Sequence, residues 1–232
     1  LRNFGGQKKK RTAFAQSDTG KQIMTAMIDA VRRKEASGMV ERFSHHSFLT
    51  LRLCGNICCG CVIRDEYSQE TVELPGDAVI VATGGMHGLF GNTTGSLSNT
   101  GEVTAELFRL GVPLANSEMI QYHPTTVKCG GKRMLISEAA RGEGGRLFAM
   151  KDGKQWYFME EKYPELGNLM PRDITAREIW KVSHESEVFL DMTEISEEII
   201  SNKLSGLADD CMTYLHKDIR KEPVSVLPGI HY

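Results

Sequence analysis

The sequence predicts an α/β domain followed by an α+β domain. Up to about Asn116, an amphipathic helical pattern and short apolar segments alternate with glycine-bearing turns. Beyond Asn116, polar and charged motifs separate short strands and helices. A chain of 232 residues is long enough for one or two domains with a sizeable core. We therefore expect a domain boundary near Asn116.

The first expected element is an amphipathic helix. Ile23, Met27 and Val31 recur every four residues, so they share one face of a helix that opens after Asp18-Thr19-Gly20. The basic run Arg32-Arg33-Lys34 suits the C-terminal end of that helix, where the backbone dipole favours positive charge.

Strands and tight turns are expected next. Residues 40–66 and 71–82 hold short apolar segments separated by turn formers, which predicts antiparallel strands that return to a buried strand over Ala78–Ala82. That strand runs into paired glycines, and a second glycine-bearing turn, Ser98–Glu102, opens a helix. Such turns let a ligand approach the backbone closely, although two ordinary tight turns would explain the glycines equally well.

The second half combines three short strands with three helices. The expected strands are Arg146–Met150, Trp156–Met159 and Val188–Leu190. The expected helices are Ile174–Val182, Glu194–Lys203 and Leu207–His216. Asp173 and Arg177 are four residues apart, which favours an ion pair on the surface of the first of these helices.

Charge and hydropathy argue against a nucleic-acid-binding protein and against a membrane-spanning protein. The chain carries 28 Lys and Arg against 30 Asp and Glu, so its net charge of -2 gives no broad field for nucleic acid or anionic membrane. No apolar run approaches the roughly 20 residues of a membrane helix. No secretory signal precedes the first motif, and both ends fall inside motifs, so we expect an internal piece of a longer cytoplasmic polypeptide.

Four of the six cysteines crowd into one short segment, at Cys54, Cys58, Cys59 and Cys61. The segment is typical of a turn and a strand, and we interpret the cysteines as small buried thiols in a reducing compartment. A disulfide between the adjacent Cys58 and Cys59 would be strained. A metal site that includes His45-His46 is the alternative, although zinc sites usually pair two short spacings across a loop.

Four polar clusters combine a His or an Arg with a Pro or Gly that fixes the backbone. They are Glu118–Thr125, Ser137–Gly145, Pro171–Asp173 and Pro228–Tyr232. Two histidines and two arginines in one cleft would suit a small dicarboxylate, because arginine binds a carboxylate with a two-pronged fork and histidine donates a charge-assisted hydrogen bond. Singly, a His beside Pro is typical of a turn, and Arg172-Asp173 is typical of an ion pair at a helix start.

The chain resembles the flavoprotein subunits of fumarate reductases and succinate dehydrogenases. Eight motifs appear in the order of that family, with similar separations: Phe4-Gly5-Gly6-Gln7, Asp18-Thr19-Gly20, Ala82-Thr83-Gly84-Gly85, Asn99-Thr100-Gly101, Gln121–Thr125, Ser137-Glu138 with Arg141–Gly145, Pro171–Asp173 and His231-Tyr232. L-Aspartate oxidase and other fumarate-reductase-like flavoenzymes share many of them. The match at Phe4–Gln7 favours the fumarate/succinate branch.

The resemblance implies an incomplete α/β FAD-binding domain and an α+β capping domain. Residues 1–116 would be part of the FAD-binding domain, residues 117–230 the cap that closes over the substrate, and residues 231–232 the start of the return to the FAD-binding domain. The Gly-x-Gly-x-x-Gly fingerprint that holds the FAD diphosphate does not occur near the start of the sequence. We therefore expect the isolated chain to bind FAD poorly.

The resemblance also assigns roles to thirteen residues. The implied cofactor-binding residues are Ala82, Thr83, Gly84, Gly85, Thr100, Gly101 and Glu102. The implied substrate-binding residues are His123, Ser137 and His231. Arg172 matches the proton donor, and Glu138 and Arg141 match the relay that returns a proton to it. Glu102 stands where the family usually has Asp, and Ser137 where it often has Thr.

The implied activity is the FAD-dependent interconversion of fumarate and succinate, by hydride transfer at flavin N5 with proton delivery from an arginine. The expected partners are fumarate or succinate and an iron–sulfur subunit or another electron-transfer protein, with no nucleic acid, metal site or direct membrane span. The expected location is the cytoplasm or the cytoplasmic face of a membrane complex. The alternatives are L-aspartate oxidase or another soluble flavoenzyme of this type, and a non-catalytic cap that binds a small acid weakly.

Overall fold

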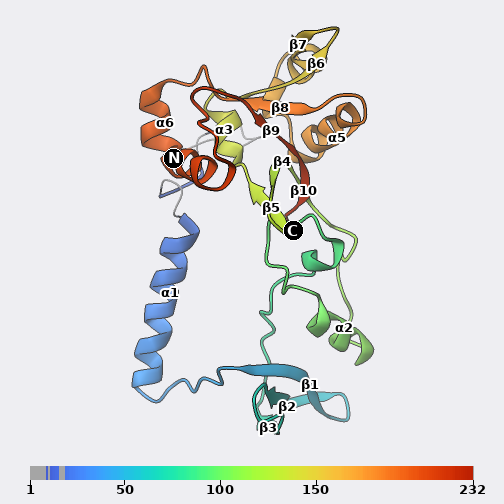
Figure 1. Cartoon of the computed structure of the whole chain (residues 1–232). Helices are drawn as coiled ribbons and strands as arrows, with labels where there is room; N and C mark the ends of the chain where they lie inside the picture. Colours follow the sequence, from blue (N-terminus) through green and yellow to red (C-terminus); the bar gives the residue numbers. More distant parts are fainter. Residues whose placement is uncertain (1–8, 10, 16–18, 232) are drawn as a thin grey trace. The chain divides into compact units, whose positions relative to one another are not determined.

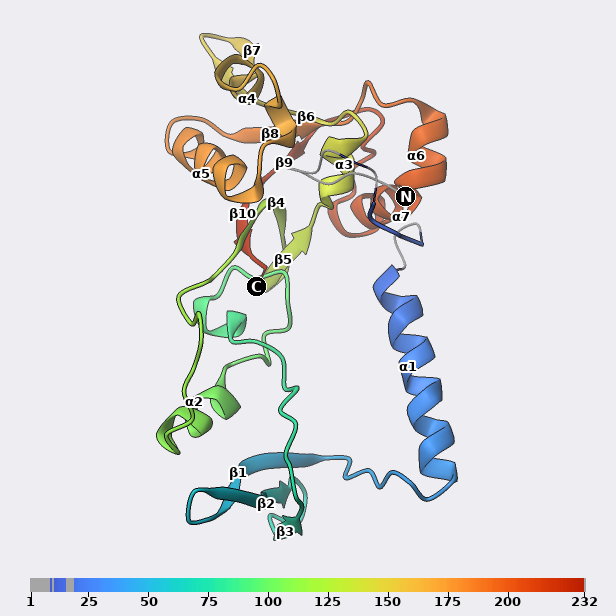
Figure 2. The ribbon, with the colours of Figure 1, turned by 180° about the vertical axis from the view of Figure 1, so that it is seen from behind.

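The computed structural model describes residues 9, 11–15 and 19–231, which form two compact units (Figures 1 and 2). Unit 1 comprises Leu1–Met24, Gly91–Thr94 and Gln121–Tyr232, and unit 2 comprises Thr25–Phe90 and Gly95–Ile120. The assignment of residues 1–116 and 117–230 to two functional domains stays a prediction. The motif Phe4–Gln7, Asp18 and Tyr232 lie outside the described residues.

Unit 1 contains a three-stranded antiparallel sheet in the order β10-β4-β5. Its central strand β4 (Tyr122–Cys129) pairs with β5 (Lys132–Leu135) on one side and with β10 (Leu227–Ile230) on the other. The register between β10 and β4 shifts between Leu227 and Gly229. Pro124 lies in this part of β4, where its missing N–H costs no regular ladder bond.

A second antiparallel sheet in unit 1 has the order β7-β6-β8-β9. Its strands are β6 (Arg146–Lys151), β7 (Lys154–Trp156), β8 (Val188–Asp191) and β9 (Val224–Ser225). The predicted strands at Arg146–Met150 and Val188–Leu190 are confirmed. The predicted strand at Trp156–Met159 is wrong beyond Trp156, because the next residues form a helix whose Phe158 and Met159 are buried.

The helices of unit 1 surround these sheets. They are α3 (Glu138–Gly142), α4 (Phe158–Lys162), α5 (Arg172–Ser183), α6 (Glu197–Lys203) and α7 (Ser205–Asp210). Short helical turns follow at η2 (Gly167–Leu169) and at η3 (Cys211–Leu215), which is a π-turn. All three predicted helices are confirmed, although α6 begins at Glu197 because Ser196 caps it through its side chain. Figures 1 and 2 show α5 and α6 on opposite sides of unit 1, with the sheets between them.

The apolar core lies in unit 1. Its fully buried members include Leu147 and Leu190 from the β7-β6-β8-β9 sheet, Ile179 from α5, and Ile136, which directly follows β5. Among the described residues, Ile63 is the one buried apolar side chain of unit 2. Unit 1 therefore offers a rigid support for polar side chains on β4, α3 and α5.

The helix α1 (Thr19–Ala36) confirms the first predicted element. Its predicted apolar face is not covered by any described residue: the side chains of Ile23, Met27 and Val31 are all about half exposed or more, and no residue of α1 is buried. No described helix is both long and apolar enough to cross a membrane.

Unit 2 contains a three-stranded antiparallel sheet in the order β1-β2-β3. The strands are β1 (His46–Cys54), β2 (Ile57–Asp65) and β3 (Thr71–Pro75), as the apolar segments predicted. They are followed by the turn η1 (His87–Phe90) and the helix α2 (Glu102–Arg109), which confirms the helix expected after the second glycine-bearing turn.

The predicted buried strand over Ala78–Ala82 is wrong. These residues form no regular secondary structure, and Ile80 is 92% exposed. An apolar run becomes a buried strand only when neighbouring strands supply its hydrogen bonds and cover both faces. No described strand pairs with this segment.

The interpretation of the cysteine cluster as buried, reduced thiols also needs correction. Cys54 and Cys59 form a disulfide across the hairpin of β1 and β2, with their Cα atoms 6.3 Å apart. Cys54 is exposed and Cys59 half-buried, and Cys58 and Cys61 are also only half-buried. The tight turn at Gly55-Asn56 brings residues five apart to a separation that a disulfide can span. No cluster of potential metal ligands occurs in the part of the chain that the structure describes.

We expect a thiol titration of the denatured, unreduced protein to find four reactive thiols, from Cys58, Cys61, Cys129 and Cys211. After reduction, all six cysteines should react. The variant Cys54→Ser should raise the unreduced number from four to five, because Cys59 loses its partner and becomes reactive. Six reactive thiols without reductant would show that the pair does not form in solution.

Candidate active site

The two predicted histidines lie side by side at one end of the β10-β4-β5 sheet. His123 is on the central strand β4, paired with Gly229, and only 1% of its surface is exposed. His231 follows the last residue of β10, and the centroids of the two rings are 5.4 Å apart. A His beside Pro is usually a turn residue, but His123 lies within a strand instead. Gly229 is required at its position, because a Cβ there would approach Thr126 Oγ1 to 2.7 Å.

His123 is held by backbone groups and by its burial. The backbone N–H of Thr125 lies 3.3 Å from Nδ1, and the carbonyl oxygen of Thr125 lies 3.2 Å from the same atom. Burial, together with the positive charges of Arg172 and Arg141 and the neighbouring His231, lowers the pKa of His123 to about 3. A neutral His123 offers a carboxylate an ordinary N–H donor, instead of the charge-assisted donor expected from the sequence.

The helix α3 positions the acidic residue of the site. Ser137 is its N-cap, and the Ser137 hydroxyl oxygen accepts a hydrogen bond from the backbone N–H of Ala139 at 3.2 Å. The cap fixes Glu138 in the first turn, where a carboxylate suits the helix dipole. Because the cap uses the oxygen of Ser137 as an acceptor, its hydroxyl hydrogen remains a donor.

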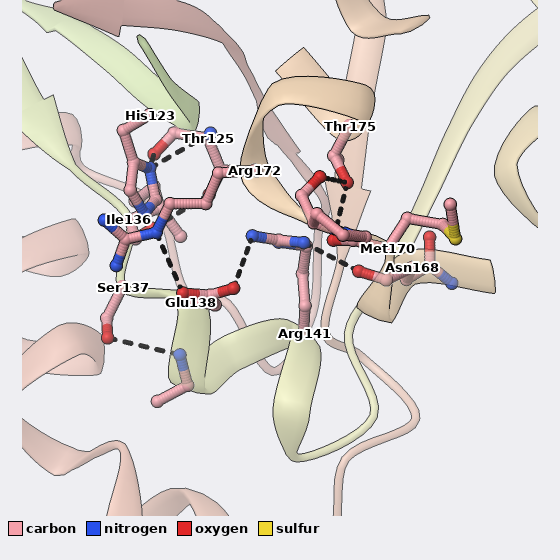
Figure 3. Close-up of polar contacts among 12 residues, drawn as sticks. His123, Thr125, Ile136, Ser137, Glu138, Arg141, Asn168, Met170, Arg172 and Thr175 are labelled. Carbon is pink, nitrogen blue, oxygen red and sulfur yellow. Dashed lines mark hydrogen bonds and ion pairs between the residues drawn. The ribbon is translucent and has the colours of Figure 1, made fainter. Parts of the chain in front are cut away.

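Glu138 lies between two arginines that are far apart in the sequence (Figure 3). Its Oε2 accepts a hydrogen bond from Arg172 Nε at 3.1 Å, and its Oε1 lies 3.5 Å from Arg141 Nη2. Its side chain is only 4% exposed, and that of Arg141 is fully buried, whereas that of Arg172 is 29% exposed. The three predicted catalytic residues therefore form a chain of charges that leads from the interior toward solvent.

Arg141 is the interior end of this chain. Its Nη1 donates to the backbone oxygen of Asn168 at 2.7 Å, while Nε and Nη2 have no hydrogen-bond partner among the described residues. Burial, with a smaller contribution from the charge of Arg172, lowers the pKa of Arg141 to about 10, against the opposing effect of Glu138. Arg141 is therefore protonated at neutral pH but is a stronger acid than an exposed arginine.

Arg172 is the outer end of the chain. It is the first residue of α5, after Pro171, and its Nη1 donates to Gln121 Oε1 at 2.8 Å. The neighbouring Asp173 lies 3.7 Å from Arg177, and both of these side chains are mostly exposed. The ion pair at the helix start thus joins Asp173 to Arg177, and Arg172 is oriented toward Glu138 and Gln121.

The predicted cofactor-binding residues lie in unit 2, in two turns that touch each other. Gly84 has a positive φ of 81°, and a Cβ at this position would lie 2.9 Å from Asn99 Nδ2, so Gly84 packs directly on the residue before Thr100. The backbone N–H of Gly88 donates to the Asn99 carbonyl oxygen at 3.0 Å. The turns at Ala82–Gly85 and Thr100–Glu102 are therefore brought together.

These two turns fit part of a dinucleotide. The backbone of Ala82–Gly85 is exposed, so a ligand can approach it. Glu102 begins α2 with an exposed carboxylate, which can accept a hydrogen bond from a ribose hydroxyl. Their cofactor-binding role stays a prediction.

Sequence reasoning missed four residues that hold the site together. Gln121 and Thr125 lie within a recognised motif, whose polar side chains beside His123 were a usable signal. Asn168 and Thr94 gave no signal, because they lie outside the recognised motifs, 27 and 137 positions along the chain from the Arg141 and His231 side chains that they contact.

The lowered pKa of His123 predicts a specific dependence of stability on pH. Below the ordinary pKa of 6.5, the unfolded chain binds a proton that folded His123 does not bind until about pH 3. Stability should therefore fall as the pH drops through this window, by up to about 1.4 kcal/mol per pH unit from this group. The free energy of unfolding in urea should be compared at pH 7 and pH 5. Between these pH values it should fall by about 1–2 kcal/mol less in the variant His123→Asn than in the unmodified protein.

An NMR titration is the direct check on that prediction. The His123 ring should stay neutral down to pH 5, and a His123→Asn spectrum assigns its signal. A midpoint for His123 near 6.5 would contradict its assignment as a neutral donor.

Comparisons with known proteins agree with this architecture. A family model described as FAD binding domain matches residues 1–232. The succinate dehydrogenase flavoprotein subunit of Bacillus subtilis is 40% identical over 241 residues, which cover 100% of this chain and 41% of that protein. The fumarate reductase flavoprotein subunit of Mycobacterium tuberculosis is 33% identical over 248 residues, which cover 100% of this chain and 42% of that protein.

Solved structures give the same result for the fold. A mutant of the quinol fumarate reductase FrdA of E. coli superimposes with a TM-score of 0.88 at 28% identity, over 100% of this chain and 42% of that chain. Sdh1 of Mycobacterium smegmatis in complex with UQ1 superimposes with a TM-score of 0.72 at 28% identity, over 100% of this chain and 41% of that chain. The chain thus spans about two fifths of the length of these relatives. The predicted fold class is confirmed, and the chain belongs to the FAD binding domain family.

Proposed function

We propose that the protein is an FAD-dependent oxidoreductase that interconverts fumarate and succinate, and that this chain supplies residues for dicarboxylate binding and proton delivery. The observation that carries the proposal is the chain Arg172–Glu138–Arg141, which ends at solvent beside two adjacent histidines. The named activities of relatives such as the Bacillus subtilis succinate dehydrogenase flavoprotein subunit support the same reaction.

The electrostatics of the cluster favour a small anion. Two guanidinium groups and one carboxylate leave an excess of one positive charge, and a neutral His123 adds a donor without adding charge. Arg172 is the partly exposed cation, so it is the one that a ligand from solvent can reach. The hydroxyl of Ser137 and the rings of His123 and His231 then offer further hydrogen bonds to the two carboxylates.

The same residues suit proton delivery. FAD, when bound, supplies the hydride chemistry of the reaction. As negative charge develops on the substrate carbon, Arg172 stabilises it and donates a proton. Once Arg172 has given up its proton, Arg141 passes a proton to the Glu138 carboxylate, and its lowered pKa makes that transfer easier. Glu138 then passes a proton to the neutral guanidine of Arg172, whose Nε lies 3.1 Å from Glu138 Oε2, and a proton from solvent restores Arg141. The 3.5 Å between Arg141 Nη2 and Glu138 Oε1 must shorten before a proton passes.

We further propose an electron-transfer partner, for which an iron–sulfur subunit is the expected class. The support is that relatives are named as flavoprotein subunits, which implies assembly with other chains in those proteins. The cytoplasm, or the cytoplasmic face of a membrane complex, stays the predicted location.

Activity assays on the whole FAD-loaded protein decide between the proposal and its alternatives. Reduction of fumarate by a reduced dye and oxidation of succinate by an oxidised dye are the expected activities. Oxidation of L-aspartate without succinate oxidation would instead identify an L-aspartate oxidase. Binding of malonate without any turnover would identify a non-catalytic acid-binding protein.

Arg172→Gln should remove most of the activity. A general acid typically accelerates a reaction by roughly 10²–10⁴-fold, so we expect kcat for fumarate reduction to fall by about that factor. Flavin content should stay near that of the unmodified protein, whereas thermal stability should fall, because the buried Glu138 carboxylate loses one of its two cationic partners. Stopped-flow or steady-state dye oxidation measures the change.

Arg177→Gln is the matched control, because Arg177 lies on the same helix and pairs with Asp173 at the surface. This exposed pair is worth at most about 1 kcal/mol, and its loss should leave kcat within about twofold. If Arg172→Gln retains more than about a tenth of kcat, another residue donates the proton.

A further inference from the structure

The segment Gly91–Thr94 belongs to unit 1 and lies along β10. Thr93 and Ile230 form a parallel bridge. The backbone N–H of Thr94 donates to the Ile230 carbonyl oxygen at 2.9 Å, and the N–H of Ile230 donates to the Asn92 carbonyl oxygen at 3.0 Å. These bonds place the side chain of Thr94 next to the residue that follows β10, which is His231.

The hydroxyl of Thr94 contacts His231 directly. Its Oγ1 lies 2.6 Å from His231 Nδ1, and it also lies 3.5 Å from the Ile230 carbonyl oxygen. The hydroxyl thus has a ring nitrogen on one side and a backbone acceptor on the other. A hydroxyl can donate or accept, so it can complement either protonation state of an imidazole.

In both protonation states of His231, the contact with Thr94 leaves a proton on the second ring nitrogen, Nε2. When the ring is neutral, the Thr94 hydroxyl donates to Nδ1 at 2.6 Å, which leaves the single ring proton on Nε2. The opposite neutral tautomer would direct the hydroxyl hydrogen to the Ile230 carbonyl oxygen, where the contact of 3.5 Å is too long for a strong hydrogen bond. When the ring is charged, Nδ1–H donates to Thr94 Oγ1, whose hydrogen turns toward the Ile230 carbonyl oxygen. In either state Nε2 carries a proton and can donate to a carboxylate.

We propose that Thr94 is a positioning residue that fixes the ring of His231 and keeps Nε2 as a hydrogen-bond donor to the dicarboxylate. The ligand in this proposal rests on the proposed function, whereas the contact with His231 does not. The arrangement favours an anionic acceptor, because a ring held in this tautomer presents a donor and never an unprotonated Nε2. The hydrogen-bond partner of the other ring nitrogen of a functional histidine commonly has this role.

The hydroxyl is not needed to attach the segment to the sheet. The backbone bonds between Thr94 and Ile230 and between Ile230 and Asn92 do so, and the Arg133 N–H adds a bond to the Thr93 carbonyl oxygen at 2.9 Å. Replacing Thr94 by the isosteric Val should therefore keep the segment in place and remove only the bond to Nδ1. This makes Thr94→Val a clean test variant, and Thr94→Ser, which keeps the hydroxyl, a rescue variant.

The first measurement is the tautomer of His231, by NMR of the whole protein labelled with ¹⁵N in its histidines. A His231→Gln spectrum assigns the signal among the seven histidines. We expect a neutral ring protonated on Nε2 in the unmodified protein and in Thr94→Ser, and a mixture of tautomers in Thr94→Val. An unchanged tautomer in a folded Thr94→Val protein would overturn the proposal. If Thr94→Val does not fold, Thr94→Ala is read in the same way.

The second measurement is binding of malonate by calorimetry. Loss of a positioned donor to a charged group should weaken malonate binding by about tenfold in Thr94→Val, and Thr94→Ser should restore it to within about threefold. KM for fumarate should rise by a similar factor while kcat changes less, because Arg172 is untouched. The control Thr193→Val removes another hydroxyl bond of unit 1, from Thr193 Oγ1 to Asp191 Oδ1 at 2.7 Å, and should leave both constants unchanged.

The outcomes separate this proposal from the proposed function. If the unmodified protein binds no malonate, the proposed function fails, and the tautomer of His231 still decides the role of Thr94. If the tautomer changes but malonate affinity and KM do not, the link between Thr94 and the ligand is refuted. A tautomer shift together with the loss of affinity, rescued by Ser, would support the proposal.

Discussion

The site depends on the buried carboxylate of Glu138. A carboxylate that is 4% exposed is stable only when cations and hydrogen bonds replace its lost hydration, and here Arg172 and Arg141 do so from two sides. Because Glu138 begins α3 and Arg172 begins α5, the contact between them ties these two helices together. Removing Glu138 would leave Arg141 as a buried charge with even fewer partners, so the three residues are a unit in the structural sense as well.

The same cluster sets the properties of its neighbours. Burial and the two guanidinium groups keep His123 neutral, so the site gains a donor without more positive charge. The charge of Arg172 and the burial of Arg141 together lower the pKa of Arg141, which suits a residue that hands on a proton. Exposure increases from Arg141 to Arg172, and this gradient gives the chain of charges a direction.

Rigid elements support every part of this arrangement. His123 is on the central strand of its sheet, Arg172 at the start of α5, and Glu138 in a helix capped by Ser137. Further contacts come from outside these elements: Asn168, in the turn η2, holds Arg141, and Thr94 holds His231 across 137 positions of sequence. These residues fix the orientation of side chains that strands and helices already position, which is how precise sites are usually built.

The sequence by itself determined the elements whose cause is local. Periodicity located α1 and α5, turn formers bounded β1–β3, and the order of the motifs indicated the family. Tertiary structure alone decided what depends on distant partners. The run Ala78–Ala82 is no strand because no described strand pairs with it, and Cys54 meets Cys59 because a hairpin turn lies between them. His123 is neutral because of charges and burial supplied by α3 and α5. Periodicity depends only on residues that are close together in the sequence, whereas desolvation and long-range hydrogen bonds exist only after the chain has folded.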